Sequence, residues 1–344
     1  MALVCGLASA PSCAPERPTT TPQEPSEAEA AAAAPERPAD ATPRTQPITS
    51  WYFGANEGVL LNVRSGDAPA IAILIDAVVG DGLPGYEAPS PAERATLLKT
   101  YGAASDLAAV YVLATHHHGD HFDPRLTLRL LQGNPRAQVI TTPQAVAAMR
   151  SVDAAAFAAI EGRARAVLPP EGSPREIALS PDVRLRILNL HHGRERRPPI
   201  EHLGFLLEVG ADAFLHLGDA ELSLDELAAL DLGAAAPKLE AIFVPYWHLL
   251  DEAWTRTLLR DTHRPSLAAL HVPTADAPAP YFEPYASQEG LVAGLRERVH
   301  VPEDSLLIPV AGSQERAYVY MTIEPSGSNC EGVAEPSMPA EASD

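Results

Sequence analysis

An apolar run that ends in a cluster of histidines is the feature that most constrains the fold of this 344-residue chain. Residues 107–115 (LAAVYVLAT) carry no charge and are bounded by polar residues. A short continuous apolar run of this kind predicts a strand that is buried on both faces, as in a sheet covered by helices. The polar residues that follow the run are therefore expected at the end of a buried strand.

The segment 48–325 alternates β-rich runs with helical runs, which predicts a layered α/β domain. Besides 107–115, strands are expected at 50–63, 70–79, 138–141, 183–190, 204–209, 213–217, 241–244, 267–271 and 317–323. Helices are expected at 91–101, with Ser90 as the N-cap, and at 143–150, 153–161, 223–230, 252–260 and 289–299.

Both ends of the chain differ in composition from this domain. Residues 1–13 hold a short apolar run that ends near Cys13, which resembles a truncated export signal of a lipoprotein without its basic residues. A disordered N-terminus or a misplaced start codon is the alternative. Residues 14–47 are rich in Pro, Ala, Glu and Thr and predict a disordered linker, and residues 326–344 predict a flexible acidic tail.

The charge and the cysteines exclude several classes of protein. Lys and Arg number 25 against 45 Asp and Glu, and the net charge of −20 excludes nucleic acid as a partner. No apolar run is long enough for a transmembrane helix, so membrane attachment would depend on a lipid anchor at Cys13. Three cysteines near the ends cannot form a disulfide framework for the domain. We expect an exported, periplasmic or membrane-anchored protein, or otherwise a cytoplasmic one.

Four metal-binding side chains follow the buried strand within six residues. They are His116, His118, Asp120 and His121, in the sequence THHHGDHFD. Imidazole and carboxylate groups are ligands that zinc, iron and manganese accept. One ion cannot easily take all four groups, whereas two ions about 3.5 to 4 Å apart could. The alternative is a solvated histidine-rich loop that binds metal adventitiously.

Further candidate ligands stand at the carboxyl ends of other predicted strands. They are the pair His191 and His192, then Asp219, then His271. Strand ends are where α/β folds place their chemistry. Because a strand alternates its faces, only one of His191 and His192 can point at a metal from regular geometry.

These motifs resemble those of the metallo-β-lactamase superfamily from Trp51 to about Pro273. The resemblance implies a four-layer αββα sandwich with two divalent metal ions, Zn²⁺ first, with Mn²⁺ or Fe²⁺ as alternatives. It assigns His192 rather than His191, because the family's histidine usually stands immediately before the loop that Gly193 opens here. Carried over residue by residue, the first metal takes His116, His118 and His192, the second takes Asp120, His121 and His271, and Asp219 bridges the two.

Within the superfamily, the HFD ending of the first motif resembles the branch of ascorbate-6-phosphate lactonase and N-acyl-phosphatidylethanolamine phospholipase D. In that branch Asp123 would accept a hydrogen bond from a ligand imidazole. A helix N-cap ahead of Pro124 is the alternative for Asp123. His202 stands where many relatives have Asn, and we expect a structural or surface role for it.

The resemblance implies hydrolysis by a metal-bridging hydroxide, with Asp120 orienting it and taking up its proton. The sequence has no Gly-x-Ser-x-Gly motif and no cysteine in the domain to serve as a nucleophile. Tyr246 and His248 are candidate catalytic acids, with a packed aromatic and a surface histidine as the alternatives. Trp247 and Trp254 are expected to pack the core or wall the pocket.

A basic cluster follows His192 in the predicted loop. Arg194, Arg196 and Arg197 could receive an anionic group of the substrate, or they could be a solvated loop paired with acidic neighbours. The function expected is a metal-dependent hydrolase that cleaves an ester, lactone, amide or phosphodiester bond of a small molecule or lipid. A mononuclear iron oxidoreductase of the persulfide dioxygenase type is the alternative, and a metal-binding protein without turnover is a third interpretation.

Overall fold

The computed structural model describes residues 48–53, 56–102, 106–232, 238–260, 262, 265–301, 305–308 and 321–323. The chain divides into two units, Met1–Arg44 and Thr45–Asp344, and the first lies entirely outside the described residues. The predicted export signal with Cys13, the linker 14–47 and the acidic tail 326–344 all lie outside the described residues, so these features stay predictions. Among the described residues, no helix has the length and apolar character needed to cross a membrane.

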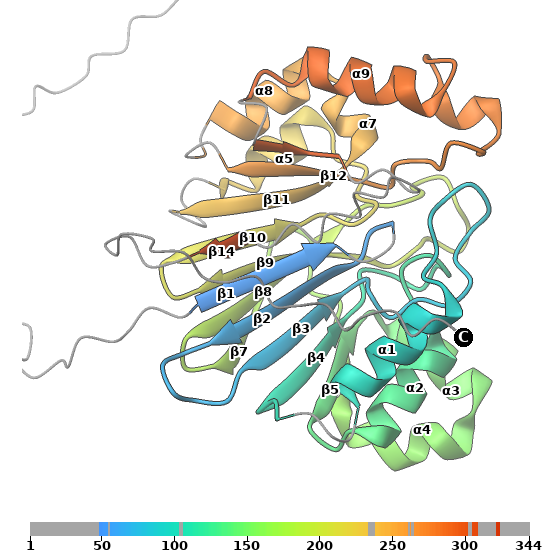
Figure 1. Cartoon of the computed structure of the whole chain (residues 1–344), viewed down its shortest axis with the longest axis vertical. Helices are drawn as coiled ribbons and strands as arrows, with labels where there is room; N and C mark the ends of the chain where they lie inside the picture. Colours follow the sequence, from blue (N-terminus) through green and yellow to red (C-terminus); the bar gives the residue numbers. More distant parts are fainter. Residues whose placement is uncertain are drawn as a thin grey trace, which may run out of the picture. The chain divides into compact units, whose positions relative to one another are not determined.

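Two seven-stranded sheets form the centre of the Thr45–Asp344 unit (Figure 1). The first has the order β14-β1-β2-β3-β4-β5-β6, with β1 (Ile48–Phe53), β2 (Val59–Arg64), β3 (Ile71–Ile75), β4 (Ala109–Leu113), β5 (Ala137–Thr141), β6 (Ala164–Ala166) and β14 (Met321–Ile323). The second has the order β13-β12-β11-β10-β9-β8-β7, with β7 (Arg175–Ser180), β8 (Val183–Leu190), β9 (His202–Val209), β10 (Asp212–His216), β11 (Leu239–Pro245), β12 (Ser266–Leu270) and β13 (Leu306–Leu307).

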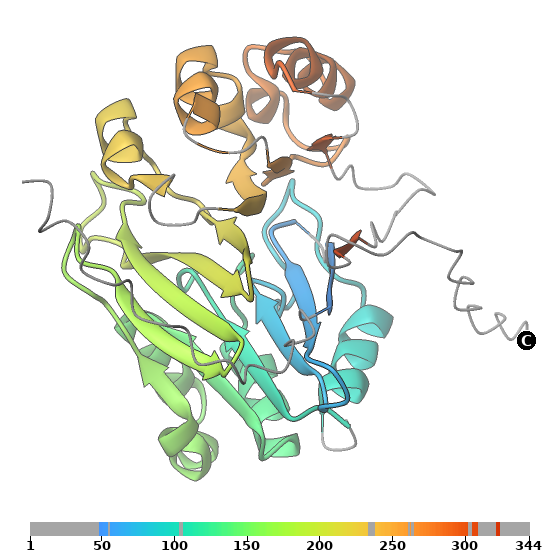
Figure 2. The same cartoon turned by 90° about the vertical axis from the view of Figure 1, so that its left-hand side faces the viewer.

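Helices cover the outer face of each sheet (Figures 1 and 2). The first sheet carries α1 (Pro91–Tyr101), α2 (Pro124–Gly133), α3 (Pro143–Val152) and α4 (Ala154–Ile160). The second carries α5 (Leu224–Ala229), α7 (Tyr246–Leu249), α8 (Glu252–Arg260) and α9 (Gln288–Arg298). Between the sheets, apolar side chains such as Ile73 and Phe205 pack in one buried cluster. The predicted αββα sandwich is therefore confirmed.

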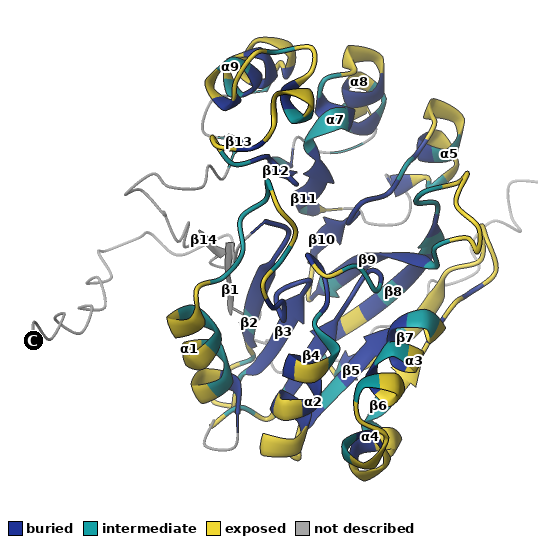
Figure 3. Ribbon diagram, turned by 90° about the vertical axis from the view of Figure 1, so that its right-hand side faces the viewer, coloured by how far each residue is buried: buried dark blue, intermediate teal, exposed yellow. Residues whose placement is uncertain are grey.

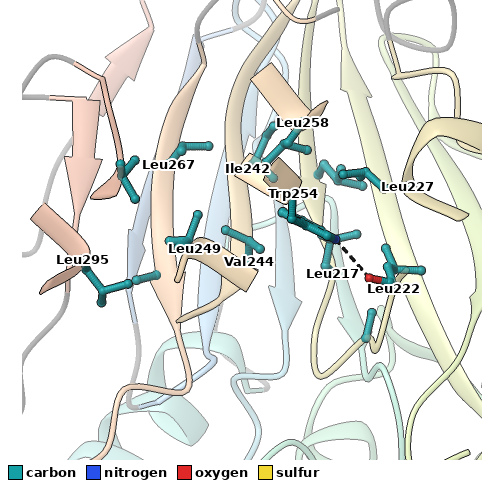
Figure 4. Packing of buried hydrophobic residues seen from close by; sticks show 14 of the residues in the cluster. Leu217, Leu222, Leu227, Ile242, Val244, Leu249, Trp254, Leu258, Leu267 and Leu295 are labelled. Atoms are coloured by element: carbon teal, nitrogen blue, oxygen red, sulfur yellow. Dashed lines mark hydrogen bonds between the residues drawn. The ribbon is translucent and has the colours of Figure 1, made fainter. Parts of the chain in front are cut away.

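Burial follows this layering. Figure 3 shows buried strands β2 to β5 beside helices whose outward residues are exposed. Outside the second sheet, Trp254 of α8 is 2% exposed and packs among leucines. Its indole Nε1 donates to the Leu222 carbonyl at 3.0 Å (Figure 4). Trp254 therefore packs the core, one of the two roles expected for it.

Several elements have the predicted bounds. Helix α1 begins and ends where expected, and Ser90 forms a capping box with Glu93. Strand β8 also has the predicted limits, Val183–Leu190. The Ser90 cap and the apolar pattern of 183–190 are local signals from which such elements can be predicted.

Several elements differ from the expectation. The single strand expected at 50–63 is a pair of antiparallel strands, β1 and β2, because the chain turns at Asn56 with a φ of 53°. The strand expected at 70–79 ends at Ile75, where Asp76 takes a φ of 46°. Helices α2 and α7 and the short strands β6, β7 and β13 were not predicted. Of the strand expected at 317–323, only Met321–Ile323 is described, and it pairs with β1.

Candidate metal centre

The predicted ligands stand at the carboxyl ends of four strands. The loop after β4 carries His116 to His121, while His192, Asp219 and His271 follow β8, β10 and β12. Strands β8 and β10 both pair antiparallel with β9, and β10, β11 and β12 are parallel. Strands β8, β10 and β12 therefore run in one direction and end at the same edge of the second sheet.

The first group of ligand atoms comes from His116, His118, His192 and Asp219, all within 4.8 Å of one another. His116 Nε2 lies 2.8 Å from His118 Nδ1 and 3.9 Å from Asp219 Oδ2, and His192 Nε2 lies 3.8 Å from the same oxygen. Burial lowers the pKa of all three imidazoles, that of His118 to about 4. The rings are therefore neutral at pH 7, the form that binds metal.

The second group comes from His121, His271, Asp219 and Glu57, with Asp120 beside them. His271 Nε2 lies 3.2 Å from Asp120 Oδ2 and 3.5 Å from Asp219 Oδ2. His121 Nε2 lies 3.3 Å from Asp219 Oδ2 and 3.7 Å from Asp120 Oδ2. This group is richer in carboxylates than the first, and all five of these residues are buried.

Asp219 Oδ2 belongs to both groups, and four imidazole nitrogens lie 3.3 to 3.9 Å from it. Two neighbours fix the loop that carries it. Gly218 has a φ of 53°, and a Cβ there would stand 2.7 Å from Thr115 Cγ2, so the close approach requires glycine. The buried His202 accepts a hydrogen bond from the Asp219 N–H through Nε2 at 3.1 Å. His202 thus has a structural place beneath the cluster.

Asp76, at the end of β3, fixes two ring orientations and was not predicted. Its carboxylate accepts from the Thr115 N–H at 2.8 Å, from the Thr115 hydroxyl at 2.7 Å and from His121 Nδ1 at 2.9 Å. Because the Thr115 hydroxyl donates its hydrogen bond to Asp76, its oxygen can accept a hydrogen bond from His116 Nδ1 at 3.1 Å. Both His116 and His121 therefore turn Nε2 into the cluster. In the sequence, Asp76 is distinguished by its place directly after the apolar residues 70–75.

The electrostatics of His121 differ from those of the first group. Burial lowers its pKa, but the Asp219 and Asp76 carboxylates outweigh burial and raise the pKa well above its ordinary value. Burial alone would raise the pKa of Asp120. The nearby His271 and His121 outweigh burial, so the pKa of Asp120 lies below its ordinary value. In the second group, carboxylates and imidazoles thus stabilise one another's charged forms.

Divalent cations fit this donor set. Buried polar atoms in proteins are nearly always hydrogen-bonded, and leaving them unpaired is costly. Yet several buried cluster atoms make no hydrogen bond in the described part of the chain: both oxygens of Glu57 and of Asp120, His121 Nε2, His192 Nε2 and Asp219 Oδ1. Imidazole nitrogens and carboxylate oxygens are ligands of zinc, iron and manganese.

Two residues with alternative predictions have clear positions. His191 Nε2 lies 3.6 Å from carboxylate oxygens of Glu171 and Glu226, so the structure brings His192 and not His191 to the cluster. Asp123 Oδ1 accepts from the Leu126 N–H at 2.8 Å and caps α2. The N-cap interpretation of Asp123 is the one that the geometry shows.

The two candidate acids have backbone partners. The Tyr246 hydroxyl donates to the Tyr281 carbonyl at 3.0 Å. His248 Nε2 donates to the Ala220 carbonyl at 2.7 Å, and its ring stacks on Trp254 with centroids 4.3 Å apart. The side chains of Tyr246 and His248 therefore hold loops near the cluster, and a catalytic role for either residue stays a prediction.

Tyr86 is a further residue that sequence reasoning missed. Its ring meets His271 edge-on, with centroids 3.9 Å apart, and Trp247 packs against the same imidazole at 5.3 Å. Tyr86 stands between α1 and β3 in a loop that the Thr274 N–H joins to the Gly85 carbonyl at 2.9 Å. A lone tyrosine in a Gly and Pro-rich loop carries no periodicity, so the sequence did not indicate it.

A surface cavity of about 460 Å³ lies beside the cluster. Its wall includes Glu221, whose Oε1 is 3.6 Å from His192 Nδ1. Arg194 donates to the Glu226 carboxylate and Arg197 donates to the carbonyls of Arg194 and Arg196. The lining residues are Arg194, Glu221, Leu222, Ser223, Glu226, Trp247 and His248.

Solved structures of low identity are similar to this chain. A protein provisionally assigned as a metal-dependent hydrolase from Parabacteroides distasonis is 14% identical, with a TM-score of 0.44 over 77% of this chain and 93% of that one. The metallo-β-lactamase fold protein YhfI from Bacillus subtilis is 12% identical, with a TM-score of 0.45 over 77% and 96%. The diiron β-hydroxylase CmlA from Streptomyces venezuelae is 14% identical, with a TM-score of 0.36 over 60% and 35%.

Neighbours with such low identities and TM-scores do not indicate which reaction this chain catalyses. A search of curated proteins finds no significant match. The family model of the beta-lactamase superfamily domain, in contrast, matches residues 72–263, more than half of the chain. That segment holds every ligand of the first group. The chain belongs to the beta-lactamase superfamily domain family.

Proposed function

We propose that this chain is a binuclear metal-dependent hydrolase that cleaves an ester, lactone, amide or phosphodiester bond. The observation that carries the proposal is the position of Asp219 Oδ2, which lies within 3.9 Å of imidazole nitrogens from both groups. A carboxylate shared by two sets of ligands suits a pair of ions about 3.5 to 4 Å apart. Membership of the superfamily supports the same function.

In this proposal, His116, His118 and His192 hold the first ion, and Asp120, His121 and His271 hold the second, with Asp219 between them. Divalent ions there would supply Lewis-acid polarisation of the scissile carbonyl or phosphoryl group and would acidify water. The Asp120 carboxylate, which makes no hydrogen bond in the described part of the chain, would orient the attacking water and take up its proton. Asp76 would keep the His121 ring in place throughout.

The leaving group needs a proton donor, and three side chains compete for this role. Tyr246 and His248 are the candidates from the sequence. Tyr86 is the candidate from the structure, because its hydroxyl has no hydrogen bond among the described residues and its ring touches His271. Burial, and then the neighbouring Tyr246 and Tyr281, raise the pKa of Tyr86 well above its ordinary value, so the hydroxyl keeps its proton at pH 7.

The substrate class is inferred from the resemblance and from the cavity beside the cluster. The resemblance to the lactonase and phospholipase branch favours a lactone or a phosphodiester. The cavity beside the cluster offers an apolar wall at Trp247 and a polar one at Ser223 and Glu221. The nitrogen-rich first group favours zinc there, with manganese or iron as alternatives in the second.

The test is metal analysis of the full chain purified without chelator, paired with a screen of chromogenic phosphodiester, lactone and ester substrates. We expect about two equivalents of metal and one active substrate class, with activity lost on chelation and restored by metal. Protein that binds no metal, or activity that is indifferent to chelation, would contradict the proposal. One equivalent of iron, with colour and oxygen consumption, would instead support the mononuclear oxidoreductase.

A further inference from the structure

Glu57 has an unusual environment beside the second group. It stands in the turn between β1 and β2, it is 0% exposed, and neither carboxylate oxygen makes a hydrogen bond in the described part of the chain. One of its oxygens lies within 4.8 Å of ligand atoms of His121, Asp219 and His271. No motif in the sequence pointed to this residue.

The backbone of Glu57 is held by the end of β10, three residues before Asp219. His216, at the end of β10, accepts a hydrogen bond from the Gly218 N–H through Nδ1 at 3.1 Å. Its Nε2 therefore carries the proton and donates to the Glu57 carbonyl at 3.0 Å. Asn56 turns the chain with a φ of 53° and brings Glu57 to this point. The same short segment thus fixes both Asp219 and Glu57.

The contrast with Asp76 shows what Glu57 lacks. Asp76 is also buried, but three hydrogen bonds satisfy its carboxylate. Glu57 has none, and the carboxylates of Asp219, Asp76 and Asp120 are its like-charged neighbours. A buried carboxylate with neither a hydrogen bond nor a full counter-charge is costly, and a cation would remove that cost.

We propose that Glu57 is a carboxylate ligand of the cation in the second group, in addition to Asp120, His121, Asp219 and His271. This inference rests on the proposed function, because it adds a ligand to the same site. It makes the second position oxygen-rich, with three carboxylates against two imidazoles. Oxygen-rich sites suit manganese, whereas the three imidazoles of the first position suit zinc. The two positions therefore differ in metal preference.

The test compares Glu57→Gln with wild type and with the control Glu201→Gln, whose carboxylate accepts from the Gln144 N–H instead. Each full chain is stripped with chelator and titrated with Mn²⁺, followed by calorimetry and electron paramagnetic resonance. We expect wild type and Glu201→Gln to bind two ions with a spin-coupled spectrum. Glu57→Gln should bind the second ion at least about 10-fold more weakly and show an uncoupled spectrum.

Two coupled Mn²⁺ ions of wild-type affinity in Glu57→Gln would overturn the inference while leaving the proposed function intact. Wild-type protein without bound metal would overturn both. Should Glu57→Gln fail to fold, anomalous diffraction from wild-type crystals loaded with Mn²⁺ decides. A peak about 2.0 to 2.2 Å from a Glu57 oxygen supports the ligand role, and a nearest peak beyond 3.5 Å overturns it.

Discussion

The two groups of ligand atoms differ in chemistry although they share Asp219. The first offers three imidazoles, and His118 and His192 are only partly buried. The second is fully buried and adds carboxylates to two imidazoles. The pKa directions are opposite as well: that of His118 is lowered to about 4, and that of His121 is raised well above its ordinary value. The candidate site is thus asymmetric, with a partly exposed group rich in imidazoles and an enclosed group rich in carboxylates.

The largest expected effect comes from the residue that joins the groups. Asp219→Ala should empty both positions and reduce kcat/KM by on the order of 10³-fold, because several kcal/mol of transition-state stabilisation depend on the ions. His118→Ala should remove only the first ion and His271→Ala only the second. Metal counting after dialysis checks these outcomes. If Asp219→Ala keeps two equivalents, the groups do not depend on a shared carboxylate.

Tyr86 packs on His271 of the second group. A substitution at Tyr86 therefore distinguishes between the candidate proton donors. Tyr86→Phe keeps the ring against His271 but removes the hydroxyl, so kcat should fall about 10²-fold with KM unchanged. The loss should grow for substrates with poor leaving groups. Tyr246→Phe is the matched control, because that hydroxyl is bonded to the Tyr281 carbonyl. A loss confined to Tyr246→Phe would favour the candidate predicted from the sequence.

Asp76 supports the second group more directly than the first. Asp76→Asn weakens the hydrogen bond that orients His121, so affinity at the second position should fall about 10 to 100-fold while the first keeps its ion. Titration calorimetry measures both steps. Asp67→Asn, in the exposed turn between β2 and β3, is the control and should leave both affinities unchanged. Equal weakening of both positions by Asp76→Asn would show that the asymmetry is wrong.

The smallest effect concerns the exposed loop beside the first group. Arg194 lowers the pKa of Glu226 from 4.5 to about 2 in the folded chain. A lowered folded pKa stabilises the fold above pH 4.5, and this contribution is lost as the pH falls toward 2. Because the two side chains are 43% and 33% exposed and solvent screens the pair, Arg194→Ala should reduce the free energy of unfolding by less than about 1 kcal/mol at pH 7.

Urea unfolding of chelator-treated protein at pH 7 and near pH 3 measures this contribution. The difference between wild type and Arg194→Ala should shrink on acidification. The control Arg150→Ala removes an exposed pair between α3 and Glu161. A stability difference for Arg194→Ala that grows as the pH falls would contradict the prediction.

The sequence predicted those parts of the structure that local patterns encode. Apolar runs and helix caps predicted most strands and helices, and strand ends predicted the place of His192, Asp219 and His271. Glu57 was hidden because the apolar residues on both sides of its turn were interpreted as one strand. Tyr86 lies in a loop without periodicity. The position of such isolated residues depends on contacts between distant segments, which spacing alone does not reveal.

Anomalous diffraction from crystals of the wild-type chain soaked in Zn²⁺ tests the shared-carboxylate site most directly. We expect two peaks about 3.5 to 4 Å apart, one among His116, His118 and His192 and the other beside His121 and His271, with Asp219 between them. A single peak, or two peaks of which either lies away from Asp219, would contradict a binuclear centre in this chain.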